Sequence, residues 1–212
     1  MRCYDDRSAI DSSPRGVDSV SRCLTGQIVD RLKAVEPTLD VVRYDLGDRP
    51  LPHLSSDAIG ALRRAELATA EQRELGALSD RMIDELKRAD LIVIGSPMHN
   101  FGISSHLKAW FDTIIRAGKT FSYSDKGPEG LLKGKRAIVV ETRGGVYTAG
   151  PAASFNHQEP HLKTLLGFIG IFDVQFIHAE GLDMGPQSRA NGLAHAGSAI
   201  EQMLDGCVEQ AA

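Results

Sequence analysis

The stretch "LIVIGSPMHNFGISSHLKAWFD", residues 91–112, passes from an apolar run through a mixed loop into a helical pattern. Its first five residues, "LIVIG", have the continuous apolar character of a parallel strand covered on both faces. The segment 106–118 has its large apolar residues on one helical stripe, with Ser104 or Ser105 as the cap and Gly118 as a left-handed stop. The stretch therefore predicts a buried strand, an unusual loop and a helix, in that order.

Similar patterns recur on both sides of this stretch. From Val20, apolar residues return every fourth position until Pro37, which predicts a helix, and "TAEQ" (69–72) is a capping box that opens another. The remaining predicted elements are strands at 39–46, 136–141 and 173–181 and helices at 161–170 and 186–207. This alternation, without an internal repeat, predicts a single α/β domain over residues 1–212, with a five-stranded parallel sheet between two helical layers.

The segment ahead of the Val20 helix departs from this pattern. A central strand should be apolar, yet "MRCYDDRSAID" (1–11) is rich in charged residues, and only "SAID" (8–11) is suitable for a strand. The sequence leaves open whether residues 1 to 10 form the first strand.

Composition narrows the class of protein. A net charge of −4 over 212 residues gives no broad attraction to nucleic acid or to an anionic membrane, and no run approaches the roughly 20 apolar residues of a membrane span. The cysteines Cys3, Cys23 and Cys207 are scattered, which predicts neither a disulfide framework nor a zinc site. We expect a cytoplasmic protein that acts on small molecules.

Three loops should meet at the carboxyl edge of the predicted sheet, where open parallel sheets bind ligands. They are "SSPRGVDSVS" (12–21), "SPMHNF" (96–101) and "TRGGVY" (142–147). In the first, the hydroxyls of Ser13, Ser19 and Ser21 either bind a phosphate at a helix N-terminus or only cap that helix. Neither a Walker loop nor a G-x-G-x-x-G fingerprint is present.

The other two loops have residues suited to a flat ligand. The run 98–101, Met-His-Asn-Phe, offers a face and hydrogen-bonding edges to a planar heterocycle, whereas a plain connector seldom needs these residues. Gly144 and Gly145 either let amides approach a ligand or form a tight turn. His99 lacks a carboxylate close by in the sequence, so it is more often a packing residue than a base, and the other histidines show no metal-binding spacing.

Long motifs resemble one known family, the FMN-dependent NADH-azoreductases. They are "SSPRG", "SVSRCLT", "PMHNFGISSHLKAWFDTIIRAGKTFSYSDKGPEGLLKGKRAIVVETRGG" and "LLGFIGIFDV", and the resemblance runs from about Ser8 to the end of the chain. It implies a three-layer, flavodoxin-like fold with strand order 2-1-3-4-5, a noncovalent FMN and NADH as electron donor. Quinones and aromatic azo compounds are the implied substrates, reduced by a ping-pong cycle in which FMN carries the chemistry and no side chain is catalytic.

The resemblance also implies which residues hold the cofactor. The phosphate positions match Ser13, Ser19, Val20 and Ser21, and the ring positions match Met98, His99, Asn100, Phe101, Thr142, Arg143, Gly144 and Gly145. The chain departs from the family at Thr142, where serine is usual, at Tyr147, where some members have histidine, and in its polar N-terminus.

The family further implies a homodimer with two sites at the interface. In "KTFSYSDKGPEG" (119–130), Phe121 would contact the partner's flavin, and Tyr147 would lie in the substrate pocket. Phe168 either lines that pocket or packs in the core.

Two alternatives stay open at this stage. A flavodoxin-type electron carrier has the same architecture without a site for NADH, although such carriers are usually more acidic than this chain. A non-catalytic relative with an impaired FMN site would follow if the polar N-terminus failed to form the first strand.

Overall fold

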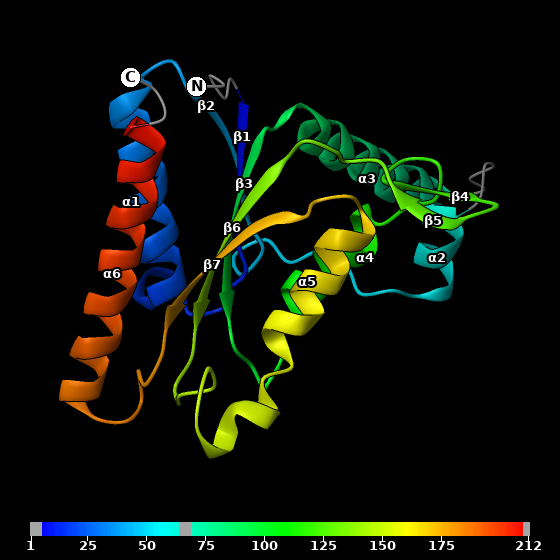
Figure 1. The fold of residues 1–212 in the computed structure, drawn as a ribbon. Helices are drawn as coiled ribbons and strands as arrows, with labels where there is room; N and C mark the ends of the chain where they lie inside the picture. The colour runs from blue at the N-terminus through cyan, green and yellow to red at the C-terminus, as the bar shows by residue number, and fades with distance from the viewer. Residues whose placement is uncertain (1–5, 64–68, 210–212) are drawn as a thin grey trace.

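The computed structural model describes residues 6–63 and 69–209, which form three layers (Figure 1). The central sheet is parallel and has the order β2-β1-β3-β6-β7. Its strands are β1 (Asp6–Asp11), β2 (Asp40–Asp45), β3 (Leu91–Pro97), β6 (Arg136–Thr142) and β7 (Asp173–Ala179). Counted along the sheet strands alone, this is the predicted order 2-1-3-4-5, so the flavodoxin-like fold is confirmed.

Helices cover both faces of the sheet. α1 (Val20–Val35) and α6 (Pro186–Glu209) lie on one face, and α3 (Ala70–Arg88), α4 (Ser105–Ile114) and α5 (Gln158–Phe168) lie on the other (Figure 1). A short helix, α2 (Ser56–Arg63), packs against α3. Each face has its own apolar core, because successive residues of β3 and β6 point alternately into one helical layer and the other. None of the helices within the described residues is both long and apolar enough to cross a membrane.

Local sequence signals set several helix boundaries as predicted. Thr69 and Gln72 form the capping box of α3, and Ser104 caps α4, its Oγ accepting from the amide of Leu107 at 3.2 Å. The predicted stop at Gly118 is wrong, because α4 ends at Ile114. The hydroxyl of Thr120 donates to the Ile114 carbonyl at 2.8 Å and so ends the helix early, while Gly118, with φ 74°, forms the turn beyond it.

A short hairpin after this turn was not predicted. β4 (Phe121–Ser124) and β5 (Gly127–Gly130) pair in antiparallel fashion apart from the main sheet. The backbone after β5 returns to the body of the protein where the amide of Leu132 donates to the Ile169 carbonyl at 2.8 Å. The segment 119–130 is therefore an ordered arm beside α2 (Figure 1).

The first strand forms despite its polar sequence, and it begins at Asp6 rather than at Ser8. β1 lies between β2 and β3, with Ile10 opposite both Tyr44 and Ile94. Asp11 ends the strand with its carboxylate accepting from the Thr25 hydroxyl at 2.6 Å, and burial raises the pKa of this carboxyl. Residues 1–5 lie outside the described part of the chain. The strand that an FMN site needs is present, which argues against an impaired first strand.

Candidate functional site

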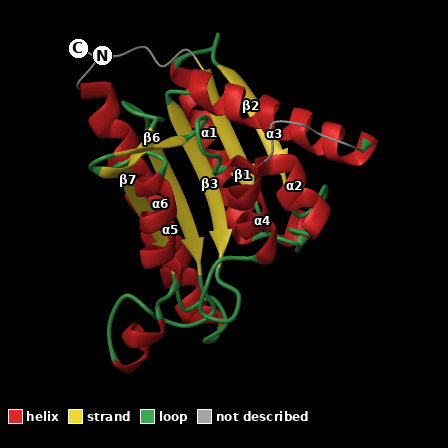
Figure 2. Ribbon diagram, turned by 90° about the vertical axis from the view of Figure 1, so that its right-hand side faces the viewer, coloured by secondary structure: helices red, strands yellow, loops and turns green. Residues whose placement is uncertain are grey.

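The three predicted loops meet at the carboxyl edge of the sheet (Figure 2). The Ser12 hydroxyl donates to the Gly95 carbonyl at 2.7 Å, and the Ser104 hydroxyl donates to the Ser12 carbonyl at 3.1 Å. On the other side, the amide of Met98 donates to the Thr142 carbonyl at 2.8 Å. Hydrogen bonds thus join the end of β3 to both neighbouring loops, so the three loops form one continuous surface.

The first loop ends at the N-terminus of α1 and is built around buried hydroxyls. Ser13, Ser19 and Ser21 are all buried; Ser19 caps the helix by accepting from the amide of Arg22, and its hydroxyl lies 3.1 Å from that of Ser21. The amides of Val20 and Ser21 precede the first intrahelical hydrogen bond, so they have no intrahelical acceptor. Two such amides beside buried hydroxyls fit the oxygens of a phosphate.

Arg22 holds this loop in place, a role that the sequence did not predict. Its guanidinium donates to the carbonyls of Gly16 and Ser13 and pairs with Asp45 at 2.6 Å. Burial alone would raise the pKa of Asp45, but the hydrogen bond from Arg22 and the other donors around it outweigh burial and lower that pKa. Because Arg22 follows the serine motif on a partly exposed helical position, no local pattern marked it.

The second loop, residues 98–101, has an unusual backbone. Asn100 and Phe101 have φ values of 45° and 71°, in the left-handed region that non-glycine residues seldom adopt. Hydrogen bonds between the main chains of His99 and Gly102 close this turn, and the Phe101 carbonyl accepts from the amide of His157 at 3.0 Å. Such strain persists only where the surroundings fix it and is commonest at functional sites.

An aromatic cluster lies beside the second loop. The Phe101 ring is 44% exposed, and its centroid is 5.4 Å from that of Phe155 and 6.1 Å from that of Tyr147. Tyr147 belongs to the third loop, so the second and third loops share one aromatic wall. An exposed wall of this kind suits the face of a flat, conjugated ligand.

The third loop, residues 142–147, is hydrogen-bonded to the turn after β7. The amides of Gly181 and Asp183 donate to the carbonyls of Gly145 and Gly144, each at 2.9 Å. A Cβ on Gly144 would lie 2.5 Å from the Asp183 carboxylate, and one on Gly145 would lie 3.2 Å from the Tyr147 ring. Both glycines are therefore used for close packing, and Thr142 is buried next to them.

The side chain of Arg143 points away from the loop surface and into the protein. It is fully buried, and its guanidinium contacts Glu141, Glu180 at 2.8 Å, and the side-chain oxygen of Gln158 at 3.0 Å. Any contact of Arg143 with a ligand in this loop would therefore have to come from its main chain.

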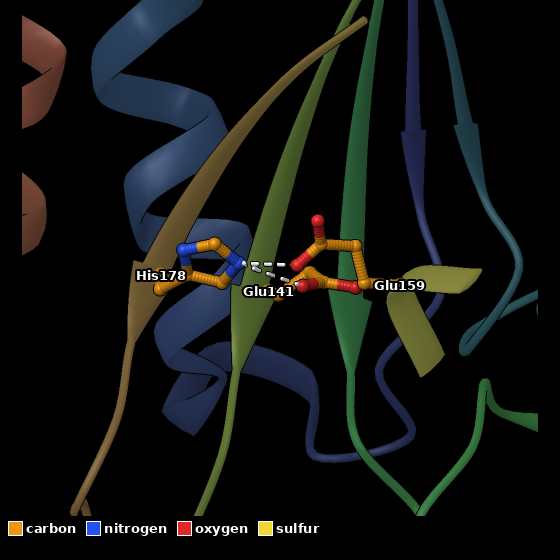
Figure 3. Close-up of side chains that lie close together, drawn as sticks. All are labelled: Glu141, Glu159 and His178. Carbon is orange, nitrogen blue, oxygen red and sulfur yellow. Dashed lines mark hydrogen bonds and ion pairs between the residues drawn. The ribbon is translucent and has the colours of Figure 1, made fainter. Parts of the chain in front are cut away.

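His178 and Glu159, whose side chains are partly exposed, extend this network towards the surface (Figure 3). The His178 Nε2 lies 3.1 Å from Glu141 Oε2 and 3.0 Å from Glu159 Oε2, and Lys163 pairs with Glu159 at 2.6 Å. With His178 protonated, three positive groups face three carboxylates. No sequence pattern marked the network, because its members are spread over β6, α5, β7 and the turns that follow the two strands.

Three members of the network have the spacing of metal ligands, since their ligand atoms lie within 4.8 Å of one another: Glu141, Glu159 and His178. However, the Arg143 guanidinium contacts Glu141 Oε2 and lies 4.0 Å from Glu159 Oε2. A cation there would face this positive charge and would have to displace the hydrogen bonds of His178. We therefore assign no metal ion to the cluster.

The network predicts a pH-dependent stability. The hydrogen bond to Glu141 raises the pKa of His178 above its ordinary 6.5; burial opposes this rise, and the hydrogen bond to Glu159 adds to it. A raised pKa stabilises the fold below the unfolded-state value, and this contribution disappears as the pH rises through the folded-state value.

We expect a His178→Gln variant to lose this dependence. Between about pH 5.5 and pH 8.5, urea unfolding should show the parent losing its stability advantage over the variant as the pH rises. Glutamine is the control for shape and hydrogen bonding, because it can still donate to one carboxylate without titrating. A difference that stayed constant over this range would contradict a charged His178.

Phe121 and Phe168 lie in a different place from the three loops. Their ring centroids are 4.6 Å apart, and both line a cavity of about 520 Å³. The rest of that cavity wall comes from α2 and the segment before it, from α4, and from the turn and hairpin that follow α4, namely Leu54, Ile59, Leu62, Asp112, Ile115, Arg116, Ala117 and Tyr123. Phe168 is partly buried rather than wholly within the core. Within one chain, this cavity does not include Tyr147.

Comparisons with known proteins agree with this geometry. A family described as having the flavodoxin-like fold matches residues 8–204. The FMN-dependent NADH:quinone oxidoreductase of Hyphomonas neptunium is 46% identical over 194 residues, covering 92% of this chain and 93% of the relative. That of Azotobacter vinelandii is 47% identical over 195 residues, covering 92% and 96%.

Solved structures give the same result. An azoreductase from Bacillus anthracis strain Sterne superimposes with a TM-score of 0.83 at 29% identity, covering 92% of this chain and 97% of the other. An FMN-dependent NADH-azoreductase from Bacillus anthracis strain Ames Ancestor, in complex with FMN, gives 0.82 at 26% identity, covering 93% and 99%.

Proposed function

The chain belongs to the flavodoxin-like fold family and is an FMN-dependent oxidoreductase, and we propose that it passes a hydride from NADH to quinones and to aromatic azo compounds. A quinone takes up two electrons in one cycle, whereas cleavage of an azo bond to two amines takes four and therefore two cycles. NADH and the oxidised substrate would occupy the same place one after the other, which is a ping-pong order.

One observation carries the proposal: the serine loop at α1, the strained second loop and the glycine loop form one hydrogen-bonded surface. This surface has the N-terminal amides of α1 at one end, which suit an anion, and an aromatic wall at Phe101 and Tyr147. FMN has a phosphate at one end and a flat ring at the other, so its chemistry matches both ends.

We assign the cofactor contacts by loop. The amides of Val20 and Ser21 and the hydroxyls of Ser13 and Ser19 would bind the phosphate, and residues 98–101 and 142–145 would hold the ring. When bound, FMN supplies the hydride acceptor for NADH and the hydride donor for the oxidised substrate. The amides of Gly144 and Gly145 would donate to the ring edge that gains negative charge on reduction.

We also propose that the active unit is a homodimer. Phe121 and Phe168 lie apart from the loops of their own chain, and Tyr123, at the end of the ordered arm, is 74% exposed. Facing a second copy, this arm would bring aromatic side chains to the partner's ring site. The mass of the FMN complex in solution, measured by light scattering, tests this proposal.

A reducing compartment such as the cytoplasm is the proposed location. Cys23 is a free and exposed thiol, which an oxidising compartment would tend to modify.

The absorption spectrum of the purified protein tests the function. After incubation with FMN and removal of the excess, we expect a bound flavin that heat releases as FMN, and whose yellow absorption band NADH removes in the absence of oxygen. Menadione should restore the band. A protein that stayed colourless, or that released FAD, would contradict the cofactor assignment.

The same experiment separates an enzyme from an electron carrier. A flavodoxin-type carrier would bind FMN but would not be reduced by NADH alone. The relatives from Hyphomonas neptunium and Azotobacter vinelandii support the enzyme, since both are oxidoreductases that match this chain over nearly their whole length.

A further inference from the structure

Gln158, the first residue of α5, lies wholly buried beneath the proposed ring site. Its side-chain Nε2 donates to the Ser96 carbonyl at 2.7 Å and to the Ser96 hydroxyl at 3.0 Å. Its Oε1 accepts from Nε of Arg143 at 3.0 Å. One amide therefore bridges the end of β3 and the start of the third loop.

From Arg143 the hydrogen bonds continue to the far side of the third loop. The guanidinium binds Glu180 Oε1 at 2.8 Å, and the same oxygen accepts from the amides of Tyr147 at 2.8 Å and Thr148 at 3.1 Å. The bridge from Gln158 thus reaches the main chain on which the Tyr147 ring depends.

Towards the second loop the connection is equally short. Ser96 is two residues before Met98, and the residue before Gln158, His157, donates its amide to the Phe101 carbonyl at 3.0 Å. The N-terminal end of α5 therefore fixes both ends of the segment 96–101. Its partner at the third loop is the Arg143 side chain, which the buried carboxylate of Glu141 holds in place.

Glutamine suits this position because its amide has a donor and an acceptor on one rigid group. A glutamate would accept from Arg143 but could not donate to the Ser96 carbonyl. A methionine of similar length would do neither, and asparagine would be too short to reach both partners.

We propose that Gln158 is a positioning residue that fixes the separation of the two ring loops, 98–101 and 142–147, and thereby the fit of the flavin ring. The choice of FMN as the ligand rests on the proposed function. The hydrogen-bonded bridge through Gln158 is formed by the protein without any ligand. It concerns the ring half of the site and leaves the phosphate loop unaffected.

The test compares Gln158→Met with two control variants. Ser79→Ala removes a buried hydroxyl outside the three loops, which donates to the Thr113 carbonyl at 2.7 Å and accepts from Arg116 at 3.1 Å, and so controls for a general loss of stability. Ser19→Ala alters only the phosphate loop. For each variant, flavin fluorescence gives the dissociation constants for FMN and for riboflavin, which lacks the phosphate, and hydrogen exchange of the flavin-free protein reports the amides of Tyr147 and Thr148.

Gln158→Met is expected to weaken the binding of FMN and of riboflavin by the same factor, about tenfold. It should also speed hydrogen exchange of the Tyr147 and Thr148 amides. Ser79→Ala should change the binding of neither ligand, and Ser19→Ala should weaken the binding of FMN alone. If Gln158→Met does not fold, Gln158→Asn should show the same pattern more weakly.

Unchanged riboflavin binding in a folded Gln158 variant would overturn the inference, as would a loss confined to FMN. If the parent itself bound no flavin, the proposed function would fail. Exchange would then decide the inference by itself: faster exchange at Tyr147 and Thr148 supports the bridge, and unchanged exchange overturns it.

Discussion

Replacing Arg143 with leucine is expected to lower the free energy of unfolding by about 3 to 5 kcal/mol, the cost of removing one partner from a buried ion pair. The side chains of Arg143 and Glu141 are both fully buried, and the two are in direct contact. Without the guanidinium, Glu141 must either keep an uncompensated charge away from water or bind a proton. Glu180 and Gln158 lose a hydrogen-bond donor at the same time.

Urea unfolding of the flavin-free protein at neutral pH measures this cost. Arg31→Leu is the matched control, since it removes the same charge from a pair with Glu201 in which both side chains are about half exposed. An exposed pair contributes about 0 to 1 kcal/mol, so the control should remain close to the parent. If Arg143→Leu were no more destabilising than Arg31→Leu, the buried network would not be a stabilising unit.

The sheet and the position of the site follow from local and topological rules. β3 and β6 are buried on both faces, and each contains a continuous apolar run, LIVI (91–94) and AIVV (137–140). Parallel strands bring their carboxyl ends to one edge, so the order of strands and helices alone identifies three loops far apart in the sequence as neighbours.

The support beneath the loops could not be predicted in the same way. Arg143 contacts residues 15 and 37 positions away, and Gln158 contacts Ser96 across 62 positions. Such pairings leave no periodic signal, so Arg143 entered the expected ring positions only through the family resemblance, and its buried side chain was not predicted. The expected start of α5 near residue 161 also hid Gln158, because the helix begins at 158 without a side-chain cap.

The hairpin was not predicted, and the start of the first strand was left open. β5 is "GPEG", which reads as a turn, but Gly130 lets the chain pass within contact distance of the Gly170 backbone. β1 has polar ends, yet neighbours on both sides complete its hydrogen-bonded ladder, and Ala9 and Ile10 supply apolar contacts at its centre. In both cases tertiary contacts override local propensity.

Gly47→Ala is expected to weaken FMN binding by roughly 150-fold. This is equivalent to about 3 kcal/mol, the upper part of the usual cost of overpacking. A Cβ on Gly47 would lie 2.0 Å from the Ser13 carbonyl oxygen and 3.3 Å from the Pro14 Cα. The backbone at Gly47 cannot move easily, because the preceding residue, Leu46, is buried in the core and its amide donates to the Asp11 carbonyl at 2.8 Å. The phosphate loop must therefore shift.

Because the shift falls on Ser13, its effect should depend on the ligand's phosphate. Fluorescence titration should find riboflavin binding nearly unchanged, so the ratio of the two dissociation constants isolates the loop. Gly26→Ala is the matched control: it makes the same substitution in α1, where a Cβ would meet nothing within 4 Å, and alanine favours a helix. Equal weakening of FMN and riboflavin by Gly47→Ala would mean that the loop from Ser13 to Ser21 does not bind the phosphate, since a purely local displacement there reaches the ring only through the phosphate end.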